Sequence, residues 1–174
     1  MHRDEYSLER IRSIAKNAPE VIVGAGSVIS LEDAKQAAGA GAKFFVAPGL
    51  VPEVVEYALK SNMPILPGCV TASDISIALN YGINVLKFFP VYQMGGAETL
   101  AQYHGGPFGK VEWVVTGGLN GKNFLPFAGI DYVLASGGDW MFAEGNAVNE
   151  KNYDKIVLNT RRTIKDVLEL RAAK

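Results

Sequence analysis

A lysine stands inside an apolar run of this sequence: residues 84–90 read NVLKFFP, and the charged residue is Lys87. Burial of a charged amine in a strand costs free energy unless the amine is paired or neutralised, so a lysine at this position needs a chemical explanation. Loss of solvation lowers the pKa of a lysine and makes more of its neutral, nucleophilic amine available. The alternative is a lysine whose stem packs among apolar neighbours while its ammonium group reaches water.

Six short apolar runs recur at regular intervals, and each contains or ends in glycine or proline. They are VIVGAG (21–26), KFFVAPG (43–49), MPILPG (63–68), NVLKFFP (84–90), VEWVVTGG (111–118) and DYVLASGG (131–138). Between them lie segments with apolar residues at helical spacing, which begin at Ser30, Pro52 and Thr71; Gly39 and Gly82 fall where helix C-caps are expected. Further helices are predicted at about 5–17 and 151–171. The pattern predicts one α/β domain over residues 1–174, with parallel strands covered by helices.

Two architectures repeat strand–helix units in this way, a doubly wound sheet and a closed (β/α) barrel. The segment GAGSVIS supplies only the first two glycines of a dinucleotide fingerprint, whereas glycine or proline closes every strand. This favours a barrel with its site above the strand ends. TGG (116–118) and SGG (136–138) close the last two strands and could bind an anion on backbone N–H groups; the alternative is that they only permit tight turns.

Composition excludes several classes of protein. Charge is balanced at 17 basic and 18 acidic residues, without a basic–aromatic block, so no nucleic-acid partner is expected. Cys69 is the single cysteine, which rules out an internal disulfide, and we expect it to be an inert packed thiol. No apolar run reaches the roughly 20 residues needed to span a membrane, and the N-terminus lacks a signal-peptide core, so a cytoplasmic protein is expected. His2 and His104 have no spacing typical of a metal site or a triad.

The series VIVGAGSV, APGL, LPG, KFFP, TGG and GGDWM resembles, in order and spacing, the 2-keto-3-deoxy-6-phosphogluconate (KDPG) aldolase family. The resemblance covers nearly the whole chain. It implies a (β/α)8 TIM barrel, usually a homotrimer, and a class I aldolase that cleaves KDPG to pyruvate and glyceraldehyde 3-phosphate. Some members act on 4-hydroxy-2-oxoglutarate. The resemblance implies imine chemistry without a metal or a diffusible cofactor.

The family's functional residues map onto single positions of this chain. The resemblance makes Lys87 the Schiff-base lysine. It implies a substrate-binding role for a wider set of residues: Arg3, Ser27, Pro48, Thr116, Gly117, Gly118, Gly137, Gly138 and Asp139. Ser27 stands where the family has a threonine that contacts the keto acid. Arg3 matches an arginine that binds the anionic substrate, with a solvated terminal arginine as the alternative. Pro48 and Pro67 are expected to shape the mouth of the site, mainly as structural residues.

Two departures from the family pattern leave alternatives open. Asp139 replaces a small residue beside the phosphate turn, where it would repel a phosphate or cap the following helix, and this favours an unphosphorylated keto acid. Arg3 aligns just after the family's second strand, so only about six of eight strands are expected and the acid/base glutamate would precede Met1. A catalytically silent barrel that only binds a keto acid or phosphate is therefore the alternative to an aldolase. Exposed strand edges would make such a chain aggregation-prone or oligomeric.

Overall fold

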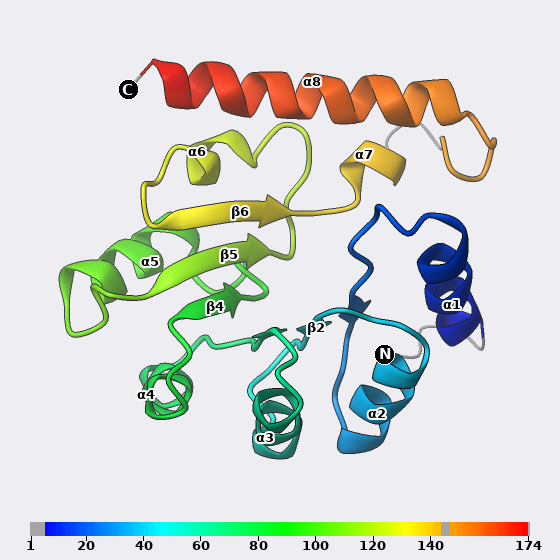
Figure 1. Ribbon diagram of the computed structural model, residues 1–174. Helices are drawn as coiled ribbons and strands as arrows, with labels where there is room; N and C mark the ends of the chain where they lie inside the picture. Colours follow the sequence, from blue (N-terminus) through cyan, green and yellow to red (C-terminus); the bar gives the residue numbers. More distant parts are fainter. Residues whose placement is uncertain (1–5, 144–146, 174) are drawn as a thin grey trace. The chain divides into compact units, whose positions relative to one another are not determined.

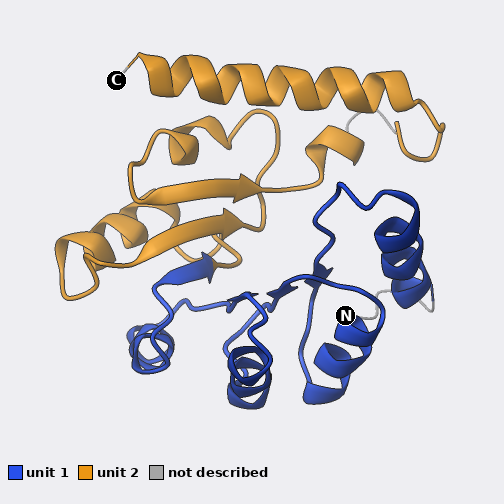
Figure 2. Ribbon diagram, in the orientation of Figure 1, with its two compact units in different colours: residues 1–87 blue, residues 88–174 orange. Residues whose placement is uncertain are grey.

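The computed structural model describes residues 6–143 and 147–173. The chain divides into two compact units, Met1–Lys87 and Phe88–Lys174, coloured blue and orange in Figure 2. Strand β4 (Val85–Phe88) ends one residue beyond this division. Six strands lie within the described part of the chain, as the apolar runs predicted.

The first unit alternates helices and strands (Figure 1). Its elements before β4 are α1 (Ser7–Asn17), β1 (Ala25–Gly26), α2 (Leu31–Gly39), β2 (Phe45–Val46), α3 (Pro52–Lys60), β3 (Ile65–Leu66) and α4 (Ala72–Asn80). Strand β2 pairs in parallel with β1 on one side and with β3 on the other. A further parallel bridge joins Gly68 to Lys87 of β4. The first unit therefore has the strand–helix repeat that the sequence predicted.

Capping residues fix the helix boundaries of the first unit. The side chain of Ser30 accepts a hydrogen bond from the Asp33 N–H at 3.1 Å and so begins α2, and Thr71 begins α4 in the same way. Gly82, with φ 76°, follows the end of α4 as predicted. The prediction for Gly39 was wrong, because the left-handed residue after α2 is Gly41, with φ 101°.

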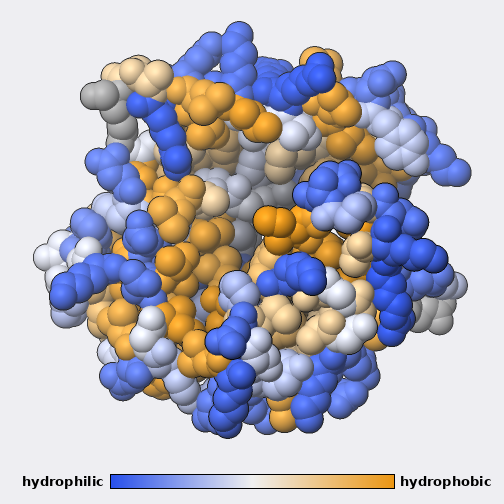
Figure 3. Space-filling model, in the orientation of Figure 1, coloured by the Kyte–Doolittle hydropathy of each residue, from blue (hydrophilic) through white to orange (hydrophobic). Residues whose placement is uncertain are grey.

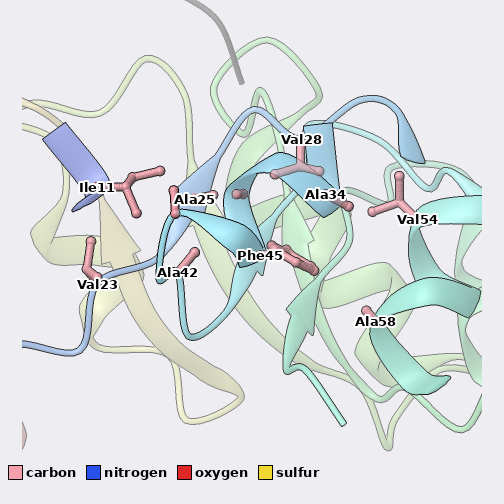
Figure 4. Packing of buried hydrophobic residues seen from close by; sticks show 11 residues of the cluster. Ile11, Val23, Ala25, Val28, Ala34, Ala42, Phe45, Val54 and Ala58 are labelled. Atoms are coloured by element: carbon pink, nitrogen blue, oxygen red, sulfur yellow. The ribbon is translucent and has the colours of Figure 1, made fainter. Parts of the chain in front are cut away.

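The core of the first unit is built mostly from small and β-branched side chains (Figure 4). Phe45 of β2 and Val54 of α3 are fully buried, and Ala34 and Ala37 of α2 belong to the same buried cluster. The first predicted strand is shorter than its apolar run, because β1 begins only at Ala25. Residues 21 and 22 lie before it with exposed side chains, whose relative exposures are 49% and 75%.

The second unit contains one parallel strand pair and four helices among its described residues. Its elements after β4 are α5 (Gly96–Gly105), β5 (Glu112–Thr116), α6 (Leu125–Ala128), β6 (Val133–Gly137), α7 (Trp140–Ala143) and α8 (Tyr153–Ala172). Strands β5 and β6 pair in parallel, with Thr116 opposite Gly137. An edge-to-face contact between the rings of Phe88 and Trp113, 5.5 Å between centroids, anchors the interior of this unit.

Helix α8 contacts α6 and α7 but buries none of its residues completely. Arg171 ties its last turn to the strand layer, since its guanidinium donates to the main-chain oxygens of Ala128 at 3.2 Å and Val133 at 3.1 Å. Apolar side chains of α8 nevertheless reach the surface (top of Figure 3), and Leu158 and Leu168 are more than 60% exposed. Within the described ranges, no helix combines the length and apolarity needed to cross a membrane.

Candidate functional site

Lys87 lies on the less buried face of β4. Burial alternates along this strand, so Leu86 and Phe88 are fully buried while Lys87 is only partly buried. Both main-chain polar groups of Lys87 bond to the segment after β3, because its N–H donates to the Pro67 oxygen and its carbonyl accepts from the Cys69 N–H, both at 2.9 Å. Strand pairing therefore fixes the backbone of Lys87, and its side chain projects from the face of β4 opposite the packed core.

The carboxyl ends of the strands in the first unit bring three predicted residues to one edge. Ser27 follows β1, Pro48 lies just after β2, and Lys87 is bridged to Gly68 just after β3. The strands are parallel and in register, so these ends share one edge of the sheet. Ser27 has φ 58°, a left-handed conformation that turns the chain sharply out of β1.

A close backbone approach at this edge was not expected from the sequence. A Cβ atom added to Gly68 would lie 2.1 Å from the Pro48 oxygen and 2.7 Å from the Gly49 nitrogen. Gly68 is therefore required for the loops after β2 and β3 to pack together beside Lys87. The glycine of LPG was visible in the sequence, but its partner depends on tertiary packing.

The glycine-rich turn of the second unit has a backbone conformation that favours glycine. Gly117 and Gly118 both have positive φ, 94° and 74°, and a Cβ at either would fall within 2.7 Å of Pro90 or Tyr92. Thr116, directly before them, has its hydroxyl oxygen buried with no hydrogen-bond partner among the described residues. Thr116 and Gly137 are paired directly, so the predicted turn residues of β5 and β6 do come together.

Two asparagines brace this turn and were missed by the sequence reasoning. The Asn123 amide donates to the Gly118 oxygen at 2.9 Å, and its side-chain oxygen accepts from the Asn120 N–H at 2.7 Å. The signal available in the sequence was the turn composition of residues 120–123, NGKN. The bracing holds the Gly118 carbonyl in a fixed orientation.

Asp139 is exposed and follows Gly138 at the end of β6. The Phe142 N–H donates to the main-chain oxygen of Asp139 at 2.9 Å, so Asp139 opens the short helix α7. A capping role for its carboxylate stays a prediction. Arg3 lies outside the described residues.

Cys69 is fully buried beside the strand end that carries Gly68. Burial, together with the negative charge of Asp74, raises the pKa of its thiol to about 12. The packed position expected for this thiol is confirmed. A thiolate is the reactive form of cysteine, so the low reactivity of Cys69 stays a prediction that the raised pKa supports.

This shift predicts a pH dependence of stability. The thiol stays protonated in the folded chain to about pH 12, whereas in the unfolded chain it ionises around its ordinary value of 9.0. Its contribution to stability is therefore complete below pH 9.0 and is lost as the pH rises toward 12. Urea unfolding at about pH 8 and about pH 10 should show a larger loss of unfolding free energy in the wild type than in Cys69→Ala. Equal losses in both proteins would contradict the raised pKa.

His104 packs as an aromatic residue and not as a ligand. Its ring stacks on Tyr132 with 3.8 Å between centroids. Across residues 6–143 and 147–173, no group of three or more histidine, cysteine, aspartate or glutamate side chains could hold a metal ion.

A cavity of about 290 Å³ lies elsewhere in the second unit, between β6, α6, α7 and α8. Its walls are mainly apolar, with Leu134, Trp140 and Leu168 among the lining residues. Among the described residues that line it, Arg171 is the only one with a titratable side chain, and its guanidinium cannot act as a nucleophile.

Comparison with known proteins agrees with this arrangement. A family model described as "KDPG and KHG aldolase" matches residues 1–158. The chain is 35% identical over 162 residues to a 2-dehydro-3-deoxy-phosphogluconate aldolase of Dickeya dadantii, covering 93% of this chain and 75% of that one. The KHG/KDPG aldolase of Escherichia coli is matched with the same identity and coverage.

Solved structures give the same family. A KDPG aldolase of Legionella pneumophila, with pyruvate captured at low pH as a covalent carbinolamine intermediate, superposes with a TM-score of 0.86 at 29% identity. The match covers 91% of this chain and 76% of that one. The predicted fold class, the (β/α)8 TIM-barrel family with about six strands in this chain, is confirmed by this similarity and by the parallel strand–helix repeat.

Proposed function

Because this chain belongs to the KDPG and KHG aldolase family, we propose that it is a class I aldolase in which Lys87 forms an imine with a 2-keto acid. The observation that carries the proposal is the position of Lys87. It is a lysine on the accessible face of a strand whose other face is packed in the core, and its backbone N–H and C=O are both hydrogen bonded to the segment after β3. The test is reductive trapping, in which borohydride and pyruvate should leave a reduced pyruvate unit attached to Lys87.

The chemistry follows from an amine and a ketone. The neutral Lys87 amine attacks the keto carbon to give a carbinolamine, which takes up a proton and loses water to give a protonated imine. The imine then accepts the electron pair of the bond between the carbon next to it and the following, hydroxyl-bearing carbon. This bond breaks as the hydroxyl gives its proton to water, which releases an aldehyde and leaves an enamine of pyruvate on the lysine. Protonation of the enamine carbon and hydrolysis of the imine then release pyruvate and restore the amine. No step needs a metal or a diffusible cofactor.

The proposed substrate is KDPG, which would be cleaved to pyruvate and glyceraldehyde 3-phosphate. Ser27, at the same edge as Lys87, is proposed to contact the keto acid through its hydroxyl. Thr116 and the two positive-φ glycines after it, together with Gly137 and Gly138, are proposed to bind the phosphate on backbone N–H groups. The buried, unpartnered Thr116 hydroxyl supports this role.

A second candidate substrate is 4-hydroxy-2-oxoglutarate or another unphosphorylated keto acid. The observation that favours it is Asp139, an exposed carboxylate directly after the glycine pair of β6. A carboxylate there would repel a phosphate group. The family description names both KDPG and KHG aldolases, and the substrate test below separates them.

We expect Asp139→Ser to tighten the binding of a phosphorylated aldehyde or keto acid, because the substitution removes a negative charge beside the phosphate. The gain should shrink at high salt, since exposed charges are screened. Calorimetric titration of both proteins with glyceraldehyde 3-phosphate at low and high salt measures the effect. As a control, pyruvate should bind equally well to both proteins. An unchanged affinity for glyceraldehyde 3-phosphate would mean that other residues set the choice of substrate.

A chain that binds keto acids without turnover is the remaining alternative. It would form the trapped adduct with pyruvate yet release no pyruvate from KDPG or 4-hydroxy-2-oxoglutarate. The homotrimer that the resemblance implies and the cytoplasmic location expected from the sequence composition stay predictions. Exposed apolar side chains along α8 are compatible with an oligomer.

A further inference from the structure

Asp74 makes a set of contacts that the imine chemistry does not use directly. It is the third residue of α4, and one of its carboxylate oxygens, Oδ2, accepts from two successive N–H groups, those of Val70 at 3.2 Å and Thr71 at 3.0 Å. The Thr71 hydroxyl in turn accepts from the Asp74 N–H at 3.2 Å, which completes a capping box. Burial disfavours the carboxylate, but the hydrogen bonds from Thr71 and Val70 outweigh it, so the pKa of Asp74 lies below its ordinary 3.8.

The segment that Asp74 holds is the one that holds Lys87. Cys69, directly before Val70, donates its N–H to the Lys87 oxygen at 2.9 Å, and Pro67 accepts from the Lys87 N–H at the same distance. The Cys69 thiol also points to the main-chain oxygen of Asp74, with 3.7 Å between sulfur and oxygen. The carboxylate therefore fixes two peptide groups immediately after the three residues that bracket the lysine.

This bracketing segment has little freedom of its own. Pro67, Gly68 and Cys69 are all buried, and Gly68 has no room for a side chain against Pro48. One end of the segment is fixed by β3, and the other end is fixed by the hydrogen bonds to Asp74. Loss of the carboxylate would free the second end alone.

From these contacts we infer that Asp74 is a positioning residue for the aldolase reaction. Its carboxylate holds the turn after β3 in one conformation and thereby sets the direction in which the Lys87 side chain projects from β4. The inference rests on the proposed role of Lys87. Displacement of a nucleophile by about 1 Å can slow a reaction about a hundredfold without removing any catalytic group. Asp74 touches no reacting atom, so its loss should lower the limiting rate of imine formation more than the affinity for the keto acid.

The test compares Asp74→Ala with Asp74→Glu and with Asp33→Ala. Glutamate at the third helical position can still close a capping box, so Asp74→Glu should restore much of the rate. Asp33 is the matched control: it is the third residue of α2, its N–H donates to the Ser30 hydroxyl, and its carboxylate accepts from the Ile29 N–H at 3.3 Å. The turn that it holds has no hydrogen bond to the Lys87 main chain among the bonds described above.

The rate of borohydride trapping is measured against pyruvate concentration for each folded variant. We expect Asp74→Ala to lower the limiting rate between about tenfold and a hundredfold, with little change in the half-saturating pyruvate concentration. Asp33→Ala should keep the limiting rate of the wild type, and any effect transmitted through the turn that carries Ser27 should appear in the half-saturating pyruvate concentration. Equal slowing in both alanine variants would overturn the inference, because a general loss of stability would then explain the slower trapping. An unchanged rate in Asp74→Ala would overturn it as well.

Amide hydrogen exchange gives a readout that does not depend on the reaction. Exchange at Lys87 and Cys69 should accelerate in Asp74→Ala and stay slow in Asp33→Ala. If the wild type forms no adduct, the proposed function is refuted. If the wild type forms the adduct and Asp74→Ala forms it equally fast, only the positioning role is refuted.

Discussion

Replacement of Lys87 with alanine or with arginine is expected to abolish aldol cleavage. Alanine removes the amine, and arginine keeps the positive charge but offers a guanidinium that is never usefully deprotonated. Removal of a covalent nucleophile costs about a thousandfold or more in rate, so both variants should fall to the background rate. Pyruvate release from KDPG and from 4-hydroxy-2-oxoglutarate, followed with a coupled reductase, measures the loss.

Lys43 provides a matched control for this experiment. It also precedes two phenylalanines, in the run KFFVAPG, but its side chain is exposed. Lys43→Ala should therefore keep the activity of the wild type. Cleavage by Lys87→Arg at a rate near that of the wild type would show that charge alone is needed, and the imine mechanism would be wrong.

Substitution of Gly68 with alanine is expected to destabilise the first unit and to disturb the lysine at the same time. The added Cβ would meet the backbone of Pro48 and Gly49, at 2.1 Å from the nearest atom, so a loop and not a flexible side chain must move. Overpacking of this kind costs about 1–3 kcal/mol of unfolding free energy. Urea unfolding measures the destabilisation, and borohydride trapping with pyruvate measures the displacement of Lys87.

Gly39 is the corresponding control, because a Cβ there has no atom within 4 Å and the backbone does not adopt a positive φ. Gly39→Ala lies at the end of α2 and should leave stability unchanged or raise it slightly, since alanine favours helix. Wild-type stability and trapping in Gly68→Ala would mean that the loops after β2 and β3 separate at little cost. The account of Gly68 as an obligatory close contact would then fail.

The strand–helix order could be predicted from the sequence because apolar runs and caps are local signals. Helices α2, α3 and α4 begin one residue after Ser30, at Pro52, and one residue after Thr71, respectively, since a side-chain cap or a proline fixes the first turn. The strands are shorter than the apolar runs that predicted them, because a strand ends where its hydrogen bonds to the neighbouring strand end. Helix α5 was not assigned, since glycines flank it on both sides and weaken the pattern.

Some features of the candidate site could also be predicted from the sequence, and others could not. Lys87 and the turn at Thr116–Gly118 could be found from the motifs KFFP and TGG, whose residue types suit imine formation and anion binding. The contact between Gly68 and Pro48 could not be found, because it depends on how close two loops come in the folded chain. The bracing of Gly118 by Asn123 and the capping box of Asp74 are local, and the patterns NGKN and T-x-x-D were open to reading but were missed. The link from Asp74 to the Lys87 backbone depends on strand pairing, which no spacing in the sequence encodes.

The central claim is that Lys87 forms an imine with a keto acid, and reductive trapping tests it most directly. The intact wild-type protein is treated with sodium borohydride in the presence of pyruvate, and then its mass and its peptides are analysed. The account predicts one reduced pyruvate unit per chain, located on Lys87 and absent from Lys87→Ala and Lys87→Arg. An unchanged mass of the folded wild-type protein, or an adduct on another lysine that persists in Lys87→Ala, would contradict it.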